Sequence, residues 1–336
     1  MSDLQPIDPE TAVDLYLDQR RDEVSGSTLQ SHEYRLQSFI EWCEEEGITN
    51  LNELTGRDLH AFRVWRREEG DLEPVTLQGQ LSTLRVFVRF CESIDAVQED
   101  LESKILLPTI SDDEGVSDTT LDPARAETIL DYLGRYRYAS RDHVIALLLW
   151  RTGMRTGTVR GLDLDDIDLD GQAIETVHRP DEDTPLKNGV NGERWIALST
   201  DTAETLRDYI DGPRVDTRDE YGREPLLTTR EGRASRSTVR DTLYRWSRPC
   251  VLGEECPHDR DPDECEAVEF DSASKCPSSR SPHDMRSGAI TAHLLDDTPP
   301  EIVSDRMDVS QDVLDQHYDR RGEREKMEQR RDYLPR

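Results

Sequence analysis

Lysine is scarce in this 336-residue sequence: it occurs only at positions 104, 187, 275 and 326, so arginine supplies 38 of the 42 basic side chains. Hydrophobic residues other than glycine make up 34%, a low share beside the ~45–50% typical of globular chains with glycine included. No run approaches the ~18 apolar residues of a membrane span, and the first ten residues lack the basic and then apolar pattern of a secretory signal. We therefore expect a cytoplasmic protein with no membrane partner.

Acidic residues are abundant: 73 Asp and Glu face 42 Lys and Arg, which gives a formal charge of -31. Apolar residues nevertheless recur at helical spacing, and this periodicity indicates a folded chain with an acidic surface. Such a surface suits a salt-accumulating, halophilic host, because molar salt screens charges within a few ångström.

The order of periodic and aperiodic segments predicts two domains. Residues 1–107 contain four helical patterns, which begin near residues 9, 27, 55 and 76 and predict a small all-α domain. Residues 108–120 are acidic, small and aperiodic, as is typical of a linker. Residues 121–325 form the second predicted domain, and residues 326–336 belong to a charged tail, for which we expect a helix.

The second predicted domain is mainly helical with a small β-hairpin sheet. Helical patterns cover residues near 122–133, 140–152, 200–210, 235–247, 283–295 and 310–317. Two strand-like runs, 173–178 and 195–198, flank a segment with two Asn-Gly dipeptides, which favour a hairpin turn. The predicted fold class is therefore mainly α with a small hairpin sheet.

Basic and nucleophilic residues follow one another in this domain in a fixed order: Arg155, Lys187 within the predicted hairpin, His283 and Arg286 in an H-x-x-R box, and Tyr318. Taken singly, an arginine is usually ion-paired at a surface and a tyrosine usually packs in a core. Their order and setting raise the functional interpretation above these structural ones.

The pattern resembles the tyrosine recombinase (phage-integrase-like) family in an archaeal version, over roughly residues 9–325. The matching residues are Thr152, Gly153, Arg155, Leu162, Lys187, Arg194, Leu198, His283, Arg286, His317 and Tyr318. The resemblance implies an α-helical DNA core-binding domain and a catalytic domain that breaks and rejoins DNA through a 3′-phosphotyrosyl intermediate. It also implies double-stranded DNA and other protomers of a synaptic oligomer as partners, and no nucleotide cofactor or catalytic metal.

The residue types fit this chemistry on their own terms. Transfer of a phosphodiester builds up negative charge, and Arg155 with Arg286 can hold it between two guanidinium groups. Tyr318 is the candidate nucleophile, helped by His283, because a phenol with a reference pKa of about 10 needs activation. Lys187 is the candidate general acid for the leaving oxygen, since an ammonium can give up a proton that a guanidinium retains.

Asp308 departs from the family pattern, which usually has a histidine or tryptophan near this position. An ionised carboxylate there repels a phosphate unless it is paired with an arginine or protonated. We expect Asp308 to orient Arg286 or Arg155, with His317 as an alternative phosphate contact. The departure also leaves open a catalytically silent DNA-binding regulator or architectural protein on the same fold.

Cysteines gather in the insertion 250–276, which carries Cys250, Cys256, Cys265 and Cys276, with His258 between them. The segment is rich in Asp, Glu and Pro, so burial of apolar groups cannot fold it, and soft thiolates favour tetrahedral zinc. We expect one structural zinc on the four cysteines, with His258 as the reserve ligand. The alternatives are incidental buried thiols or a protein-interaction module.

DNA binding by an acidic chain requires local clusters of cations. The candidate arginines are those at positions 35, 57, 63, 66, 67, 85 and 89 of the first domain and 230, 233, 236, 240, 245 and 248 of the second. Neighbouring acids predict that at least half of them serve in salt bridges.

Overall fold

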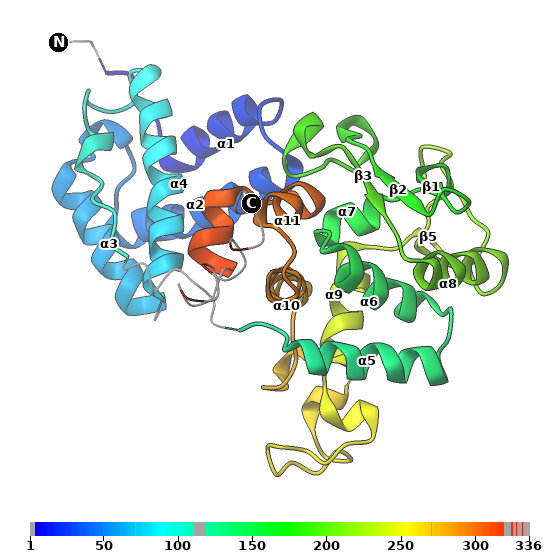
Figure 1. Ribbon diagram of the computed structural model, residues 1–336. Helices are drawn as coiled ribbons and strands as arrows, with labels where there is room; N and C mark the ends of the chain where they lie inside the picture. Colours follow the sequence, from blue (N-terminus) through cyan, green and yellow to red (C-terminus); the bar gives the residue numbers. More distant parts are fainter. Residues whose placement is uncertain are drawn as a thin grey trace. The chain divides into compact units, whose positions relative to one another are not determined.

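The computed structural model describes residues 4–70, 72–110, 119–269 and 271–318, together with 324, 327 and 331. The chain divides into two compact units, Met1–Ser117 and Asp118–Arg336 (Figure 1). Residues 111–118 of the predicted linker and nearly all of the predicted tail helix lie outside the described residues.

The first unit is all-α. Its helices are α1 (Pro9–Arg20), α2 (Gly26–Glu46), α3 (Gly56–Gly70) and α4 (Pro74–Ser93), with short 3-10 turns at Leu51–Glu53 and Glu102–Lys104. Asp8 caps α1 by accepting a backbone N–H bond, as Asp8-Pro9 predicts. The cap of α2 is Ser25, so this helix begins at Gly26, one residue before the predicted start near residue 27. The core is aromatic: Phe39 contacts Trp42, Phe62 and Phe87 ring to ring. The four predicted helices are confirmed.

The second unit surrounds a buried helix, α6 (Arg141–Thr152), in which every residue from 143 to 150 is buried. Packed against it are α5 (Pro123–Tyr136), α8 (Thr200–Asp211), α9 (Arg236–Trp246) and α10 (Pro282–Leu295) (Figure 1). A helix that is apolar on all sides can only be satisfied at the centre of a domain. The predicted mainly helical fold is confirmed.

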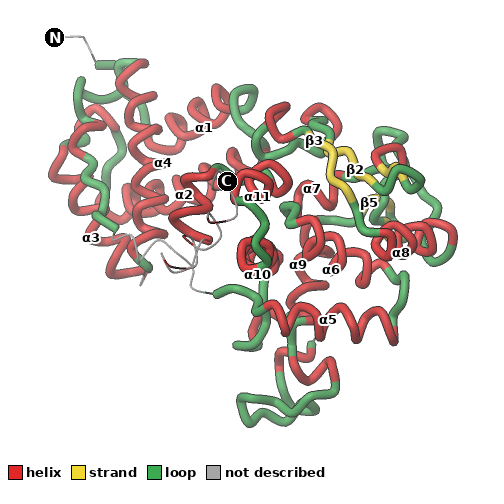
Figure 2. The backbone as a smooth tube through the Cα atoms, in the orientation of Figure 1, coloured by secondary structure: helices red, strands yellow, loops and turns green. Residues whose placement is uncertain are grey.

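The sheet of this unit has three antiparallel strands in the order β1 (Ile167–Asp168), β2 (Ala173–Thr176) and β3 (Arg194–Ala197) (Figure 2). Ile174 pairs with Ile196 on the buried side. The predicted pair of strands is present, but no tight Asn-Gly turn joins them. Residues 177–193 instead form a long loop with two 3-10 turns, Pro180–Glu182 and Gly189–Gly192.

The remaining elements include some that the sequence patterns did not predict. They are α7 (Thr156–Gly161), the strand pair β4 (Thr228–Thr229) and β5 (Gly232–Arg233), and α11 (Pro300–Met307). The predicted helix 310–317 is a short helix, α12 (Gln311–Val313), followed by a π-helical turn, Leu314–Tyr318. Among the described helices, none has the length and hydrophobicity required to cross a membrane.

Candidate functional site

Arg155 stands at the junction of α6 and α7, and the sequence around it explains why. Gly153 ends α6 in the left-handed region, with φ +61°, where a side chain would also collide with Met307. Arg155 is the extended residue that starts α7. Arg155 therefore lies between the two helices and not within either of them, and its side chain is partly buried, with 26% exposed.

His283 and Arg286 lie in the first turns of α10. Ser281 and Asp284 form a capping box in which each side chain accepts the other's backbone N–H, at 3.2 and 2.7 Å. Residues three apart share a helix face, so His283 and Arg286 lie one above the other. Arg286 is 4% exposed and donates through Nη1 to the backbone carbonyl of Gly153.

Asp308 joins the two arginines. Its backbone carbonyl accepts hydrogen bonds from Arg155 Nη2 at 2.7 Å and from Arg286 Nη2 at 3.3 Å. Its carboxylate pairs with Arg155 Nη1 and accepts from Asn188 Nδ2 at 2.6 Å. The carboxylate thus contacts Arg155, whereas Arg286 is held by the main chain of the same residue.

Two further polar residues border this group. Asn188 comes from the β2–β3 loop, and Arg194 opens β3, where its Nε donates to the carbonyl of Arg306 at 2.9 Å. Burial lowers the pKa of Arg194, and the charge of Arg155 lowers it further against the opposing effect of Asp308. The family resemblance includes Arg194 but implies no role for it, and the sequence marks Asn188 only by its turn dipeptide.

Burial also dominates the electrostatics of Arg286. Desolvation lowers the pKa of this guanidinium to about 10, the positive charge of Arg155 adds to the effect, and the charge of Tyr318 opposes it. A buried cation without a directly paired carboxylate is expensive to maintain. Among the described residues no carboxylate forms an ion pair with Arg286, so an anion bound beside it would stabilise the guanidinium.

Lys187 and His283 lie beside the arginine pair. Lys187 is exposed on the β2–β3 loop, next to Asn188. Partial desolvation lowers the pKa of His283, and the positive charges of Arg286, Lys187 and Arg155 act in the same direction against Asp284. The His283 ring is therefore biased toward its neutral form, which can accept a proton.

Tyr318 ends the π-helical turn and is 8% exposed. It packs in a small cluster with Ile290, Leu294, Met307 and Leu314, and its carbonyl accepts from Thr291 Oγ1 of α10 at 3.5 Å. Both contacts attach it to the helix that carries Arg286. Of the other predicted site residues, Arg155 and Arg286 contact Asp308 directly. Tyr318 acts electrostatically on Arg286, and Lys187 acts on His283.

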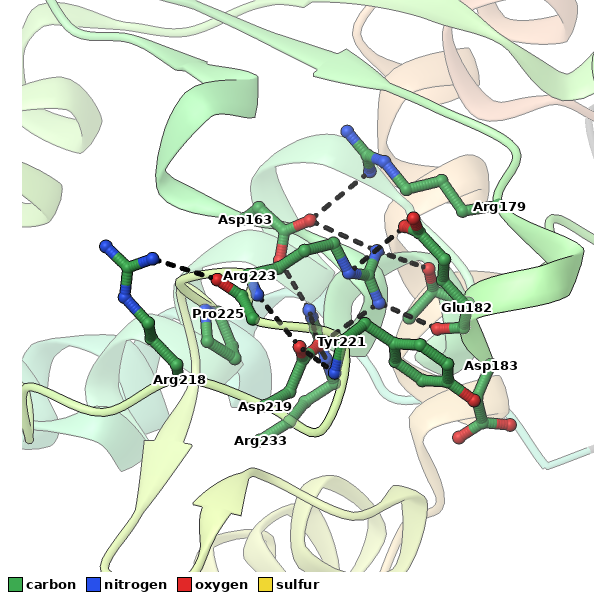
Figure 3. A network of polar contacts seen from close by, with 12 residues as sticks. Asp163, Arg179, Glu182, Asp183, Arg218, Asp219, Tyr221, Arg223, Pro225 and Arg233 are labelled. Atoms are coloured by element: carbon green, nitrogen blue, oxygen red, sulfur yellow. Dashed lines mark hydrogen bonds and ion pairs between the residues drawn. The ribbon is translucent and has the colours of Figure 1, made fainter.

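An ion network connects the first part of the β2–β3 loop to the rest of the second unit (Figure 3). Asp163, with 5% of its side chain exposed, pairs with Arg233 at 2.5 Å, Arg223 at 3.2 Å and Arg179 at 3.5 Å. Arg223 also donates to the carbonyl of Glu182 at 2.7 Å and to Thr184 Oγ1 at 2.9 Å. The network therefore ties both ends of the segment 179–184 to the unit's core.

The cysteine insertion lies between α9 and α10 in the second unit. Its four cysteines and His258 line one small cavity, of about 10 Å³. All four thiols are free and partly exposed. In the part of the chain that the structure describes, no three His, Cys, Asp or Glu side chains are close enough together to hold a metal ion.

Some of the arginines that the sequence offers for DNA binding instead form buried ion pairs or hydrogen bonds within the second unit. Arg233 belongs to the ion network, and Arg248 is 4% exposed and donates to the carbonyl of Ala267. These two positions are corrections to the predicted set, because the fold buries their guanidinium groups. The exposed members include Arg57 in the first unit and Arg236 and Arg240 on α9.

Comparisons with known proteins agree with this architecture. A family model described as the phage integrase N-terminal SAM-like domain matches residues 14–93, and the phage integrase family model matches residues 119–259. The second match ends within the cysteine insertion, so His283, Arg286, Asp308 and Tyr318 lie beyond it.

Curated relatives match the chain in part. Tyrosine recombinase XerC of Pseudomonas syringae pv. tomato is 26% identical over 181 residues, which are 52% of this chain and 59% of that protein. A probable integrase/recombinase protein of Methanocaldococcus jannaschii is 27% identical over 197 residues, 57% of each chain. The chain thus spans somewhat more than half the length of these relatives.

Solved structures match over nearly the whole chain. The Tn1549 transposon integrase in complex with a circular intermediate DNA gives a TM-score of 0.65 at 15% identity, covering 95% of this chain and 99% of that one. A lambda integrase dimer bound to a COC′ core site gives 0.63 at 14% identity, covering 95% and 79%. At such identities the likeness establishes the fold.

Proposed function

Because the chain belongs to the tyrosine recombinase (phage integrase) family, we propose that it is a site-specific DNA recombinase that acts through a 3′-phosphotyrosyl intermediate on Tyr318. The observation that carries the proposal is the convergence of Arg155 and Arg286 on one point, the carbonyl of Asp308. Two guanidinium groups held on one acceptor can clamp a phosphate, which offers several acceptor oxygens.

Electrostatic stabilisation is the first role of this clamp. Attack on a DNA phosphodiester adds negative charge to the nonbridging oxygens, and fixed cations stabilise that charge most where water is excluded. Arg286 is buried and has no carboxylate of its own among the described residues, so a bound phosphate supplies the negative charge that the site lacks. Arg194 adds a third cation next to the pair.

Nucleophilic attack then forms one bond and breaks another. The Tyr318 oxygen bonds to phosphorus, and the bond from phosphorus to the 5′-oxygen of the next nucleotide breaks. The phenol proton leaves to His283, whose lowered pKa keeps the ring neutral and able to accept it. Lys187 gives a proton to the departing 5′-oxygen, and its place on an exposed loop leaves it free to approach DNA. Attack of that 5′-hydroxyl on the phosphotyrosine breaks the bond to the Tyr318 oxygen and restores the original strand. Attack of a 5′-hydroxyl from a partner strand breaks the same bond and joins the two strands.

DNA also has to be held outside the reacting phosphate. Exposed arginines on α9 and in the first unit, Arg236, Arg240 and Arg57, are suited to contacts with the phosphate backbone. We further propose that several protomers act together on two DNA sites, and that the protein works in the cytoplasm of a halophilic host. The lambda integrase of similar fold is a dimer bound to a core site.

Covalent capture tests the proposal. A double-stranded substrate with a nick close to the crossover site loses a short fragment after cleavage, so the covalent complex cannot reverse. Wild-type protein should then migrate with labelled DNA in denaturing electrophoresis, and Tyr318→Phe should bind the same DNA without forming the adduct. An adduct at wild-type level in Tyr318→Phe would exclude Tyr318 as the nucleophile.

A catalytically silent DNA-binding protein is the second candidate, and the ion pair between Asp308 and Arg155 favours it. A carboxylate that neutralises one of the two arginines weakens their electrostatic attraction for a phosphate. The same experiment separates the two functions: DNA binding without any covalent adduct, in the presence of correctly nicked target DNA, supports the silent protein.

A further inference from the structure

The insertion 250–276 has no part in the active site, and the family match ends within it at residue 259. In Figure 1 it is the yellow to orange segment that extends away from the body of the second unit. Three short 3-10 turns, Pro249–Leu252, Glu266–Val268 and Ala273–Lys275, are its only helical elements in the described residues. The segment therefore has little regular structure to stabilise it.

Apolar burial is also slight. Among the described residues of the insertion, the apolar side chains that are fully buried are Ala267 and Ala273. Ordering a segment of this length costs conformational entropy at every residue, and two methyl groups contribute little against it. A further cross-link is needed to hold the segment in one conformation.

The four cysteines of this segment line one cavity. Cys250, Cys256, Cys265 and Cys276 are spread over the whole insertion, yet all line the same cavity, whose volume of about 10 Å³ is close to what one water molecule requires. The two other cysteines, Cys43 and Cys91, are buried in the core of the first unit. The insertion thus brings together every thiol that the second unit has.

Charge gives the second, independent observation. Arg248 also lines the cavity and is 4% exposed. It donates to the carbonyls of Ala267 and Arg245, but no described carboxylate forms an ion pair with it. A buried guanidinium beside four thiols is stabilised when those thiols are ionised, and four thiolates around Zn²⁺ carry an excess of negative charge.

We propose that the four cysteines bind one structural zinc ion and that Arg248 compensates the charge of the zinc–thiolate centre. Binding converts four thiols into thiolates with release of their protons. The four cysteines line the cavity, but no three described side chains are close enough together to hold a metal ion, so binding requires the thiol groups to move toward its centre. His258 donates to or accepts from Ser278 Oγ at 2.7 Å instead and remains outside the ligand set.

The zinc ion connects the insertion to the helices on either side. Cys250 follows the end of α9 by four residues, and Cys276 precedes the N-cap of α10, Ser281, by five. Where the segment returns, Ser247 Oγ accepts from the backbone N–H of Arg280 at 2.7 Å. Zinc therefore fixes the connection that leads into the helix of His283 and Arg286.

Metal analysis is the direct test, and it requires no DNA. Protein purified without chelators should contain one zinc per chain, and a mercurial reagent should release it as four thiols react. Replacement by Co²⁺ should give the visible bands and thiolate charge transfer of a tetrahedral sulfur site. Substoichiometric zinc in folded protein, with the four insertion thiols freely alkylated, would overturn the proposal.

Variants identify the ligands and the charge partner. Cys250→Ser and Cys276→Ser should lose zinc, whereas Cys91→Ala, a thiol of the other unit, should keep it. Arg248→Gln should weaken zinc binding about 10-fold to 100-fold, as loss of an outer-shell partner typically does. Arg245→Gln is the control, because Arg245 lies three residues earlier and is exposed, and it should leave zinc binding unchanged. Loss of zinc in His258→Ala with retention in one cysteine variant would overturn the four-cysteine set.

Hydrogen exchange follows the structural role without relying on any variant. Chelation of zinc from the wild-type protein should remove amide protection over residues 247–282 and leave the first unit, residues 9–93, unchanged. Unchanged protection over 247–282 after complete removal of zinc would show that the metal does not hold this connection.

Discussion

Asp308 offers the sharpest test of the active site because its side chain and its main chain hold different groups. In Asp308→Asn the amide oxygen can still accept from Arg155, a flipped Asn188 amide can accept from the new NH2 group, and the backbone carbonyl still accepts from both arginines. Asn also tolerates the left-handed backbone at this residue, φ +52°. A charge-assisted hydrogen bond contributes ~1.5–3 kcal/mol and a neutral one ~0.5–1.5 kcal/mol, so the free energy of unfolding should fall by about 1 kcal/mol.

Cleavage by Asp308→Asn should stay within about threefold of the wild-type rate, since about 0.6 kcal/mol of activation free energy corresponds to that factor. Asp308→His should be slower. A protonated ring about 5 Å from a guanidinium is repelled by about 3 kcal/mol at an effective dielectric constant of ~20, so the ring stays neutral. A neutral imidazole has one acceptor atom and cannot serve both Arg155 and Asn188. If the poorer orientation of Arg155 raises the activation free energy by about 1.4 kcal/mol, cleavage becomes about tenfold slower.

The assay is single-turnover formation of the covalent complex on a nicked substrate, at one fixed high salt concentration. Asp305→Asn is the matched control, because it removes an equal charge from an exposed position on α11, the helix that Asp308 ends. Faster cleavage by Asp308→His would show that the carboxylate faces the phosphate and opposes transfer. Unchanged rates in both variants would place Asp308 outside the site.

Three further predictions concern proton transfer, the ion network and close packing. Lys187→Arg should bind DNA normally but cleave slowly, because a guanidinium does not readily give up a proton. A substrate with a 5′-phosphorothiolate leaving group, which needs no proton, should restore the cleavage rate. Failure of that rescue would show that Lys187 is not the general acid. Asp163→Asn should lower the free energy of unfolding by about 3 kcal/mol, because it removes a buried carboxylate that three guanidinium groups share and leaves Arg233 with Asp219 as its remaining ion-pair partner among the described residues. An unchanged urea midpoint would contradict this. Gly288→Ala should destabilise the second unit by about 2 kcal/mol or more through overpacking, since a Cβ there meets the carbonyl oxygen of Leu121 at 2.1 Å; thermal unfolding at the wild-type temperature would refute that clash.

Local sequence signals account for the helices and for the residues that begin and end them. The capping box at Ser281 and Asp284 starts α10, and Gly153 ends α6, so the positions of Arg286 and Arg155 within their elements could be predicted from neighbouring residues alone. The buried helix α6 likewise follows from its continuous apolar run. These features depend on interactions within about four residues, which a sequence pattern records directly.

Tertiary structure alone decided which of these residues meet. Arg155 and Asp308 are 153 residues apart in the sequence, and no periodic pattern predicts that two residues so far apart come into contact. The sequence suggested that the Asp308 carboxylate orients Arg286 or Arg155; in the fold it pairs with Arg155, and Arg286 instead reaches the backbone carbonyl, a group that every residue has. Asn188 contributes from a loop that was expected to be a tight turn, and Arg233 is buried in an ion network where a DNA contact was considered. Charged side chains of one type are interchangeable in a sequence pattern, and only packing determines which of them is buried beside an opposite charge and which faces solvent.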